Sequence, residues 1–167
     1  TTDPTNNIWI HDSFKLIDNN WQELIKSWVG QDPLDSVAKH NWKGEGAVGP
    51  FLSTTEETVW KMPLKYGQVY DARLVWNSAP NIDSRDNLDL IVTLPDGTIF
   101  LGNDLAGEGI KDDIETIEGV HIPSESLSNF EFVEVKIVAR EVGVGPVKSV
   151  VGLNGDKIGF ALAVKGV

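Results

Sequence analysis

The segment Leu88-Asp-Leu-Ile-Val-Thr-Leu-Pro-Asp-Gly-Thr-Ile-Phe-Leu101 has the residue pattern of a β-hairpin. In its first half every second residue is leucine or valine, the alternation expected of a strand with one buried face. Pro95 and Gly97 predict a tight turn, because proline presets φ at the first central position and glycine tolerates the positive φ that follows. Residues 98–101 form the return strand.

The sequence after Phe51 repeats this β pattern. Clusters of glycine, proline, asparagine and serine separate the candidate strands from one another. The predicted strands are 58–62, 68–76, 88–94, 98–101, 115–122, 131–139, 146–151 and 158–164. No segment between them has the pattern of a crossover helix, so the order favours an antiparallel sandwich over a parallel sheet. We therefore expect a mainly β domain over residues 51–167.

Residues 1–50 have a different character. Alternating apolar residues suggest one or two short strands within 8–16. From Asp18 the spacing becomes helical, and the apolar positions Trp21, Leu24, Ile25, Trp28 and Val29 predict a helix that ends before Gly30. A second short helix is expected over 32–42. We predict a small N-terminal helical segment that precedes the β domain.

The net charge of the chain is −11, and most of it lies between Asn81 and Glu118, where ten acidic and two basic residues leave −8. This charge argues against nucleic-acid binding, since phosphates would be repelled. No apolar run has the ~20 residues of a membrane span. The chain has no cysteine, which excludes disulfides and thiolate zinc sites and leaves the compartment open.

The crowded acids between Asn81 and Glu118 predict a calcium site. Unpaired carboxylates that lie close together repel one another, whereas a calcium ion offsets the repulsion and takes hard oxygen ligands of this kind. Solvated surface acids are the alternative for any single position. The candidate ligands are Asp83, Asp86, Asn87, Asp89, Asn103, Asp104, Asp112, Asp113 and Glu115.

Several motifs in this part of the chain follow one another in the order of a known family. They are Tyr70-Asp-Ala-Arg-Leu-Val-Trp76, Ala79-Pro80, Asp86-Asn-Leu-Asp-Leu90, Pro95-Asp-Gly97, Gly102-Asn-Asp104, Asp113-Ile-Glu115, the strand around Val135, and Phe160-Ala-Leu-Ala-Val164. The chain thereby resembles the C-terminal β-jelly-roll domain of secreted subtilisin-like serine proteases, which is similar to the P-domain of proprotein convertases. Two features depart from the family: its usual Asn-Asp-Leu-Asp-Leu reads Asp86-Asn-Leu-Asp-Leu90 here, and the loop after Leu105 lacks aromatic residues.

The resemblance implies a mainly β fold, an antiparallel β-sandwich of jelly-roll type. It also implies a calcium-binding accessory domain in an extracellular protein, either secreted or on the cell surface. Such a domain stabilises the protease or aids substrate binding. Its partners would be a subtilisin-like catalytic domain in the parent chain and a protein substrate.

The sequence offers little evidence for an enzyme. His11, His40 and His121 stand outside any recognisable triad, and no serine elbow, phosphate loop or zinc-protease motif is present. Paired carboxylates for glycoside hydrolysis stay open, because their separation depends on the fold. We expect a non-catalytic domain.

A carbohydrate-binding module with structural calcium is the alternative function. Such a module needs a solvent-facing aromatic platform. The six tryptophans Trp9, Trp21, Trp28, Trp42, Trp60 and Trp76 all lie in the first half of the chain. Burial is favoured for them, because Trp21 and Trp28 share an apolar helical face and Trp76 ends a core strand.

Overall fold

The computed structural model describes residues 2–3, 8–13, 49–78, 86–104, 107–109, 115–143 and 155–167. Strands dominate this part of the chain, and its helix is limited to α3 (Ser124–Leu127). The strands are β1 (Thr2–Asp3), β2 (Ile8–Asp12), β3 (Glu57–Pro63), β4 (Tyr70–Trp76), β5 (Asn87–Thr93), β6 (Ile99–Leu101), β7 (Ile117–Ile122), β8 (Phe132–Glu141) and β9 (Phe160–Lys165). The predicted mainly β class is confirmed.

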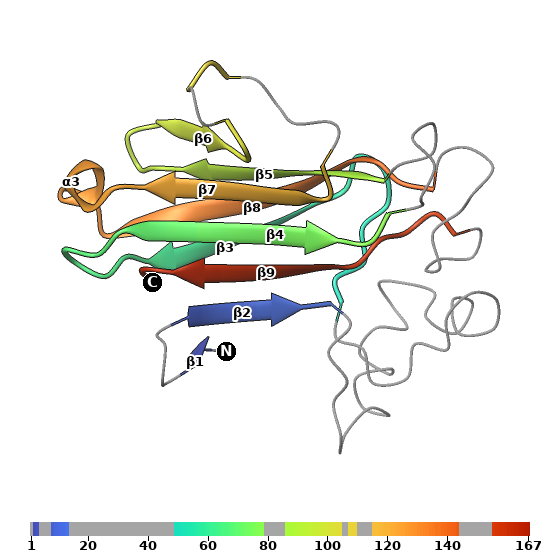
Figure 1. The fold of residues 1–167 in the computed structure, drawn as a ribbon, viewed down its shortest axis with the longest axis horizontal. Helices are drawn as coiled ribbons and strands as arrows, with labels where there is room; N and C mark the ends of the chain where they lie inside the picture. The colour runs from blue at the N-terminus through green and yellow to red at the C-terminus, as the bar shows by residue number, and fades with distance from the viewer. Residues whose placement is uncertain are drawn as a thin grey trace.

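The strands form two antiparallel sheets that pack face to face (Figure 1). One sheet has the order β1-β2-β9-β4-β7, and the other has the order β3-β8-β5-β6. Strands from the beginning of the chain pair with strands from its end: β2 with β9, and β3 with β8. Moving inward along the sequence, β4 pairs with β7, and β5 pairs with β6. This order of eight strands in two sheets is that of a jelly roll, with β1 added at one edge.

The core lies between the sheets and follows the period-2 alternation of each strand. In β4, Tyr70, Ala72, Leu74 and Trp76 are buried, while the residues between them face outward. The leucines and valine of β5 meet them from the opposite sheet and are completely buried. Side chains from the two inner faces therefore fill one continuous apolar layer, as in other sandwiches.

The sandwich begins earlier in the chain than the predicted boundary at residue 50. β2 pairs along its full length with β9, so that Ile8 lies opposite Lys165 and Asp12 opposite Ala161. The sequence prediction missed this pairing because a strand pattern does not name its partner. The predicted helices at 18–29 and 32–42 and the predicted strand at 146–151 lie outside the described residues.

Ser13 fastens the start of the sandwich to its last strand. Its amide donates to the carbonyl of Phe160 at 2.9 Å, and its buried hydroxyl donates to the carbonyl of Pro50 at 2.9 Å. The amide of Gly49 donates to the carbonyl of Ser13 at 3.0 Å. Ser13 and Gly49 therefore lie side by side in the structure, although 35 residues, 14–48, separate them in the sequence. None of the described helices is long and apolar enough to cross a membrane.

Candidate functional site

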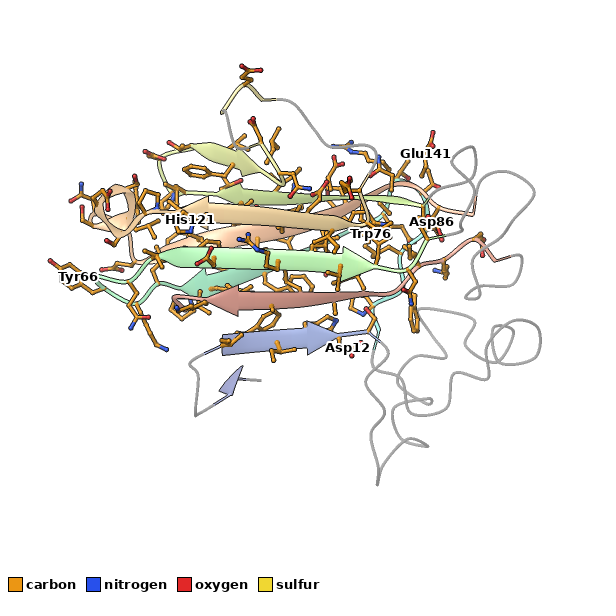
Figure 2. The ribbon with its side chains drawn as sticks, in the orientation of Figure 1. Asp12, Tyr66, Trp76, Asp86, His121 and Glu141 are labelled. Carbon is orange, nitrogen blue, oxygen red and sulfur yellow. The ribbon has the colours of Figure 1, made fainter. Side chains whose placement is uncertain are left out.

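Asp86 lies at the end of the sandwich where β4 ends and β5 begins, beside Trp76 (Figure 2). Its carboxylate accepts a hydrogen bond from the amide of Gly143 at 2.7 Å, and its carbonyl accepts one from the indole Nε1 of Trp76 at 2.8 Å. Its own amide donates to the hydroxyl of Ser78 at 2.7 Å. Burial raises the pKa of the Asp86 carboxyl, and the Gly143 amide acts in the opposite direction. Asp86 therefore joins three chain segments.

Asn87 and Asp89 are two residues apart in β5, positions that share one face of a strand. Asp89 is only 2% exposed and accepts a hydrogen bond from Nε of Arg140. Arg140 is the extra residue of a β-bulge, because Asn87 pairs with Glu141 while Leu88 pairs with Ala139. The side-chain oxygens Asn87 Oδ1 and Asp89 Oδ1 are both inaccessible to solvent. These two hard oxygens are of the type that calcium takes.

Asn103 follows β6, at the point where the chain leaves the four-stranded sheet and hydrogen-bonds to β7 of the five-stranded sheet. Its amide donates to the carbonyl of Gly119 at 2.9 Å, and its Oδ1 accepts from the amide of Gly119 at 2.9 Å. Its Nδ2 donates to the carbonyl of Ile117 at 2.7 Å. Asn103 adopts a φ of 58°, a conformation that asparagine tolerates better than most residues. It pairs with β7 as a short strand would.

Asp104 and Glu115 complete the described part of the predicted set. The two carboxylate oxygens of Asp104 accept the amides of Glu108 at 3.0 Å and Gly109 at 2.8 Å, so this side chain closes its own loop. Glu115 is exposed just before β7.

The described candidates fall into separate places rather than one cluster. Asp86, Asn87 and Asp89 lie at the start of β5, whereas Asn103 and Asp104 follow β6. Within the described ranges, no three acidic or histidine side chains come close enough to hold a metal ion together. Asp83, Asp112 and Asp113 lie outside those ranges. The calcium site therefore stays a prediction.

Glu118 is a buried acid that the sequence analysis did not single out. It is 1% exposed, and its Oε2 accepts a hydrogen bond from the amide of Leu90 in the opposite sheet. The carbonyl of Leu90 accepts the amide of Gly102 at 2.8 Å, after which the chain turns away to β7. Glu118 thus supplies the acceptor that a longer β6 would have provided. We call Leu90, Gly102, Asn103, Glu118 and Gly119 the β6–β7 junction.

A sequence signal for Glu118 existed. Glu118, Val120 and Ile122 share one face in the predicted strand 115–122, so an acid there had to face the core. The absence of a side chain at Gly102 makes room for it, because a Cβ on Gly102 would lie 2.7 Å from Cβ of Glu118.

Trp9 and Trp60 pack between the two sheets, at the edge formed by β2 and β3. Their ring centroids are 5.6 Å apart in an edge-to-face arrangement, and Trp60 also contacts Phe160 at 6.1 Å. His11 lies among these rings, 5.2 Å from Trp60 and 5.6 Å from Phe160. Burial lowers the pKa of His11. These two half-buried tryptophans form an aromatic cluster at the edge of the sandwich, where they line a pocket of about 210 Å³ together with Met62 and Val167. Their edge-to-face packing differs from the flat, open platform that sugar binding requires.

His121 and Asp71 form a cross-strand pair on the outer face of the five-stranded sheet. Nδ1 of His121 is 2.8 Å from Oδ1 of Asp71, and Nη2 of Arg73 is 3.7 Å from the same oxygen. The His121 side chain is 54% exposed, so water competes for this contact. Exposed pairs of this type contribute on the order of 0–1 kcal/mol to stability.

A scan against protein-family models and a search of curated proteins each found no match to this chain.

Proposed function

We propose that the chain is a non-catalytic, calcium-binding jelly-roll accessory domain of an extracellular subtilisin-like protease. The proposal rests on the positions, within the sandwich, of the motifs that resemble the family. The Leu-Val-Trp76 motif ends β4 at the indole that binds Asp86, and the motif beginning at Asp86 continues as β5. The motif from Phe160 to Val164 forms most of β9. The motifs thus fall on the strands β4, β5 and β9 and on the contact between Trp76 and Asp86, which supports a shared fold.

The packing of Trp9 against Trp60 favours this proposal over a carbohydrate-binding module. A sugar needs a flat aromatic face open to solvent, and the edge-to-face contact turns these two rings toward each other. Trp76 is 6% exposed and also faces the core. The accessory role predicts that the chain alone does not hydrolyse peptides. Peptide cleavage that is lost on mutation of one serine of this chain would contradict it.

The described residues supply part of the chemistry for calcium. Asn87 Oδ1 and Asp89 Oδ1 offer two solvent-inaccessible oxygens at one end of the sandwich. Calcium takes six to eight oxygen ligands, so the described pair needs further ligands from Asp83, Asp112 or Asp113. Asn103 and Asp104 follow β6 rather than this pair, and their side chains hold β7 and their own loop.

Melting curves in calcium and in chelator test the proposed site. A ligand that binds only the folded state stabilises it by about 2.7 kcal/mol when its concentration is a hundred times Kd. For a domain of this size the shift in Tm is on the order of 5 °C. Magnesium should substitute poorly, since its small octahedral shell does not suit many protein oxygens.

Two variants separate the site from the general charge. Asp89→Asn should lose most of the calcium shift, whatever its effect on stability through Arg140. Asp156→Asn is the matched control, because Asp156 is exposed and outside the predicted ligands, and it should keep the shift. Identical melting curves of the wild type in millimolar calcium and in excess chelator would refute the metal site. The accessory fold would then stand without a metal.

A further inference from the structure

Strand β3 has a sheet neighbour on one side only. It pairs with β8 and forms one edge of the four-stranded sheet. The residue pairs Leu64–Glu131 and Glu56–Ala139, at its two ends, are joined by backbone hydrogen bonds. Such pairs alternate along antiparallel strands, so the even-numbered residues from 56 to 64 bond to β8. The odd-numbered residues turn their backbone N–H and C=O groups toward the open edge.

This open edge is accessible to another chain. Its residues Glu57, Val59 and Lys61 are exposed, and within the described part of the chain no backbone group bonds to them on this side. Pro63 follows at the next outward position and has no N–H, so pairing ends there. An extended chain that added to this edge would exchange hydrogen bonds with the three exposed residues.

The opposite sheet extends past β3, because β2 and β1 continue beyond it (Figure 1). Trp9 of β2 contacts Trp60 there, and both are only half-buried. The cavity of about 210 Å³ beside them is also lined by Met62, Pro63 and Val167. A strand added to β3 would lie under β2 and direct every second side chain into this apolar cavity.

The charges along β3 differ between its two ends. Glu56 and Glu57, at the start, each form an ion pair with a lysine. Lys61, which lines the cavity, lies opposite Glu134 of β8, but its ammonium lies 3.7 Å from the centroid of the Phe132 ring. An added strand would place a residue on the other side of Lys61, where an acid makes a favourable cross-strand pair.

We propose that β3 binds an extended segment of a partner polypeptide as an antiparallel fifth strand of its sheet. The segment carries an acid opposite Lys61 and apolar residues opposite Trp60 and Met62. In this mode of recognition, backbone hydrogen bonds give affinity and pockets for alternate side chains give specificity. A second copy of β3 fits less well, because its own Trp60 and Met62 pack against its own core. The proposal uses none of the candidate calcium ligands, so the two tests are independent.

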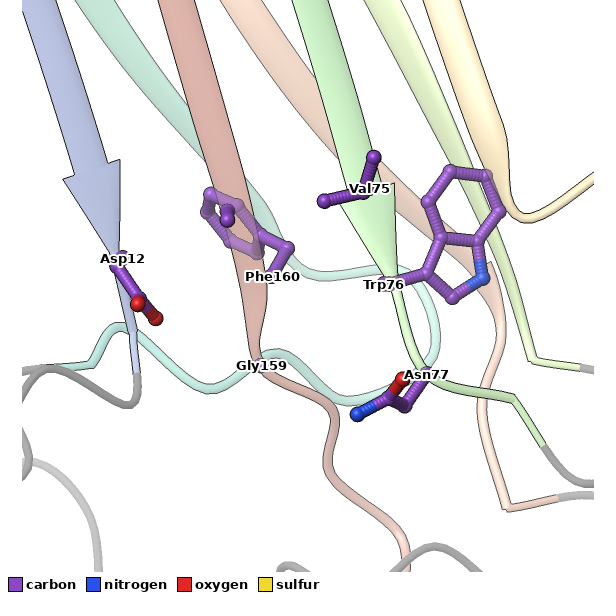
Figure 3. Close-up of a pocket in the computed structure, with 7 residues that line it drawn as sticks. Asp12, Val75, Trp76, Asn77, Gly159 and Phe160 are labelled. Atoms are coloured by element: carbon purple, nitrogen blue, oxygen red, sulfur yellow. The ribbon is translucent and has the colours of Figure 1, made fainter.

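A blocked peptide Thr-Thr-Val-Asp-Leu-Thr-Thr has the required pattern and serves as the probe in protein-observed NMR. It should bind with a Kd on the order of millimolar, as expected for a short ligand. At ten times Kd it should slow hydrogen exchange of the Glu57, Val59 and Lys61 amides about tenfold. A second cavity, between Asp12 and Asn77 at the other end of β9, is the internal control, and the signal of Asn77 should not shift (Figure 3).

Two N-methylated peptides separate strand addition from simple filling of the cavity. A methyl group on the aspartate nitrogen removes the donor to the Lys61 carbonyl and should weaken binding at least about fivefold. The same group on the leucine nitrogen points away from β3 and should change binding less than about twofold. Serine in place of both valine and leucine should weaken binding at least about tenfold, because the apolar contacts are lost.

Variants of the protein complete the test. Val59→Pro removes an edge donor that β8 does not use and should weaken binding at least about fivefold; the peptide comparisons decide the question even if this variant does not fold. Lys61→Gln should remove a preference of about two- to fivefold for the aspartate peptide over its asparagine form, whereas Lys165→Gln, on the other sheet, should keep it. Equal binding of the two N-methylated peptides, unchanged exchange of the edge amides, or an aspartate preference that survives Lys61→Gln would overturn the proposal.

Discussion

Replacing Glu118 by alanine should destabilise the sandwich and expose one specific backbone amide. In the wild type, the Glu118 carboxylate is the acceptor for the Leu90 amide at the β6–β7 junction, where water is excluded. Removing it leaves a buried donor without its acceptor, which costs about 1–3 kcal/mol, and a small cavity adds to this. We expect a total loss of roughly 2–4 kcal/mol, or about 5–15 °C in Tm.

Glu118→Gln is the matched variant, because it keeps an acceptor oxygen at the same position. Its loss should be under about half that of alanine, since a neutral acceptor makes a weaker bond but avoids a buried charge. Glu115→Ala removes an exposed acid just before the same strand and should change stability by less than about 0.5 kcal/mol.

Urea unfolding followed by circular dichroism measures these free energies, and hydrogen exchange measures the Leu90 amide directly. That amide should exchange slowly in the wild type and in Glu118→Gln, but rapidly in Glu118→Ala, while Val92 stays protected in all three. An alanine variant as stable as the wild type, with a protected Leu90 amide, would refute this account of the β6–β7 junction.

Three further predictions concern protonation and chain connectivity. Burial lowers the pKa of His11 from its ordinary 6.5, so the unfolded chain binds the proton more readily and stability should fall as pH drops through about 6.5. His11→Phe should remove this loss in Tm between pH 7.5 and 5.5, and a variant with the same loss would contradict the assignment. Burial raises the pKa of Asp86, so Asp86→Asn should gain stability relative to the wild type as pH rises from 4 to 7; an equal difference at both pH values would count against it. Replacing residues 14–48 by a short glycine-serine linker should leave a cooperatively folded sandwich, because Ser13 and Gly49 are hydrogen-bonded; loss of cooperative melting would contradict this.

The sequence predicted those parts of the fold that depend on residues close to one another in the sequence. The hairpin turn is confirmed by the positive φ of 90° at Gly97, and the strand predicted at 131–139 is confirmed as β8. The pairing of β2 with β9 was missed, because alternation marks a strand without naming its partner. Charge density predicted where acids gather but not their roles: Asp104 holds its own loop, as short acidic side chains often do. Asn103 meets β7 only because the chain crosses between sheets there.

The position of β9 has a consequence for the order in which this protein can fold. Among the nine described strands it is the last to be synthesised, yet it lies between β2 and β4 in the middle of its sheet. Until β9 emerges, β2 has only the two-residue β1 beside it, and β4 lacks one of its two neighbours. The pairings of β9 with β2 and with β4 join parts of the chain that are distant in the sequence, and pairings of this type slow folding. A chain cut before Phe160 should therefore lose the whole sheet rather than one strand, so the domain becomes native only after its final strand is made.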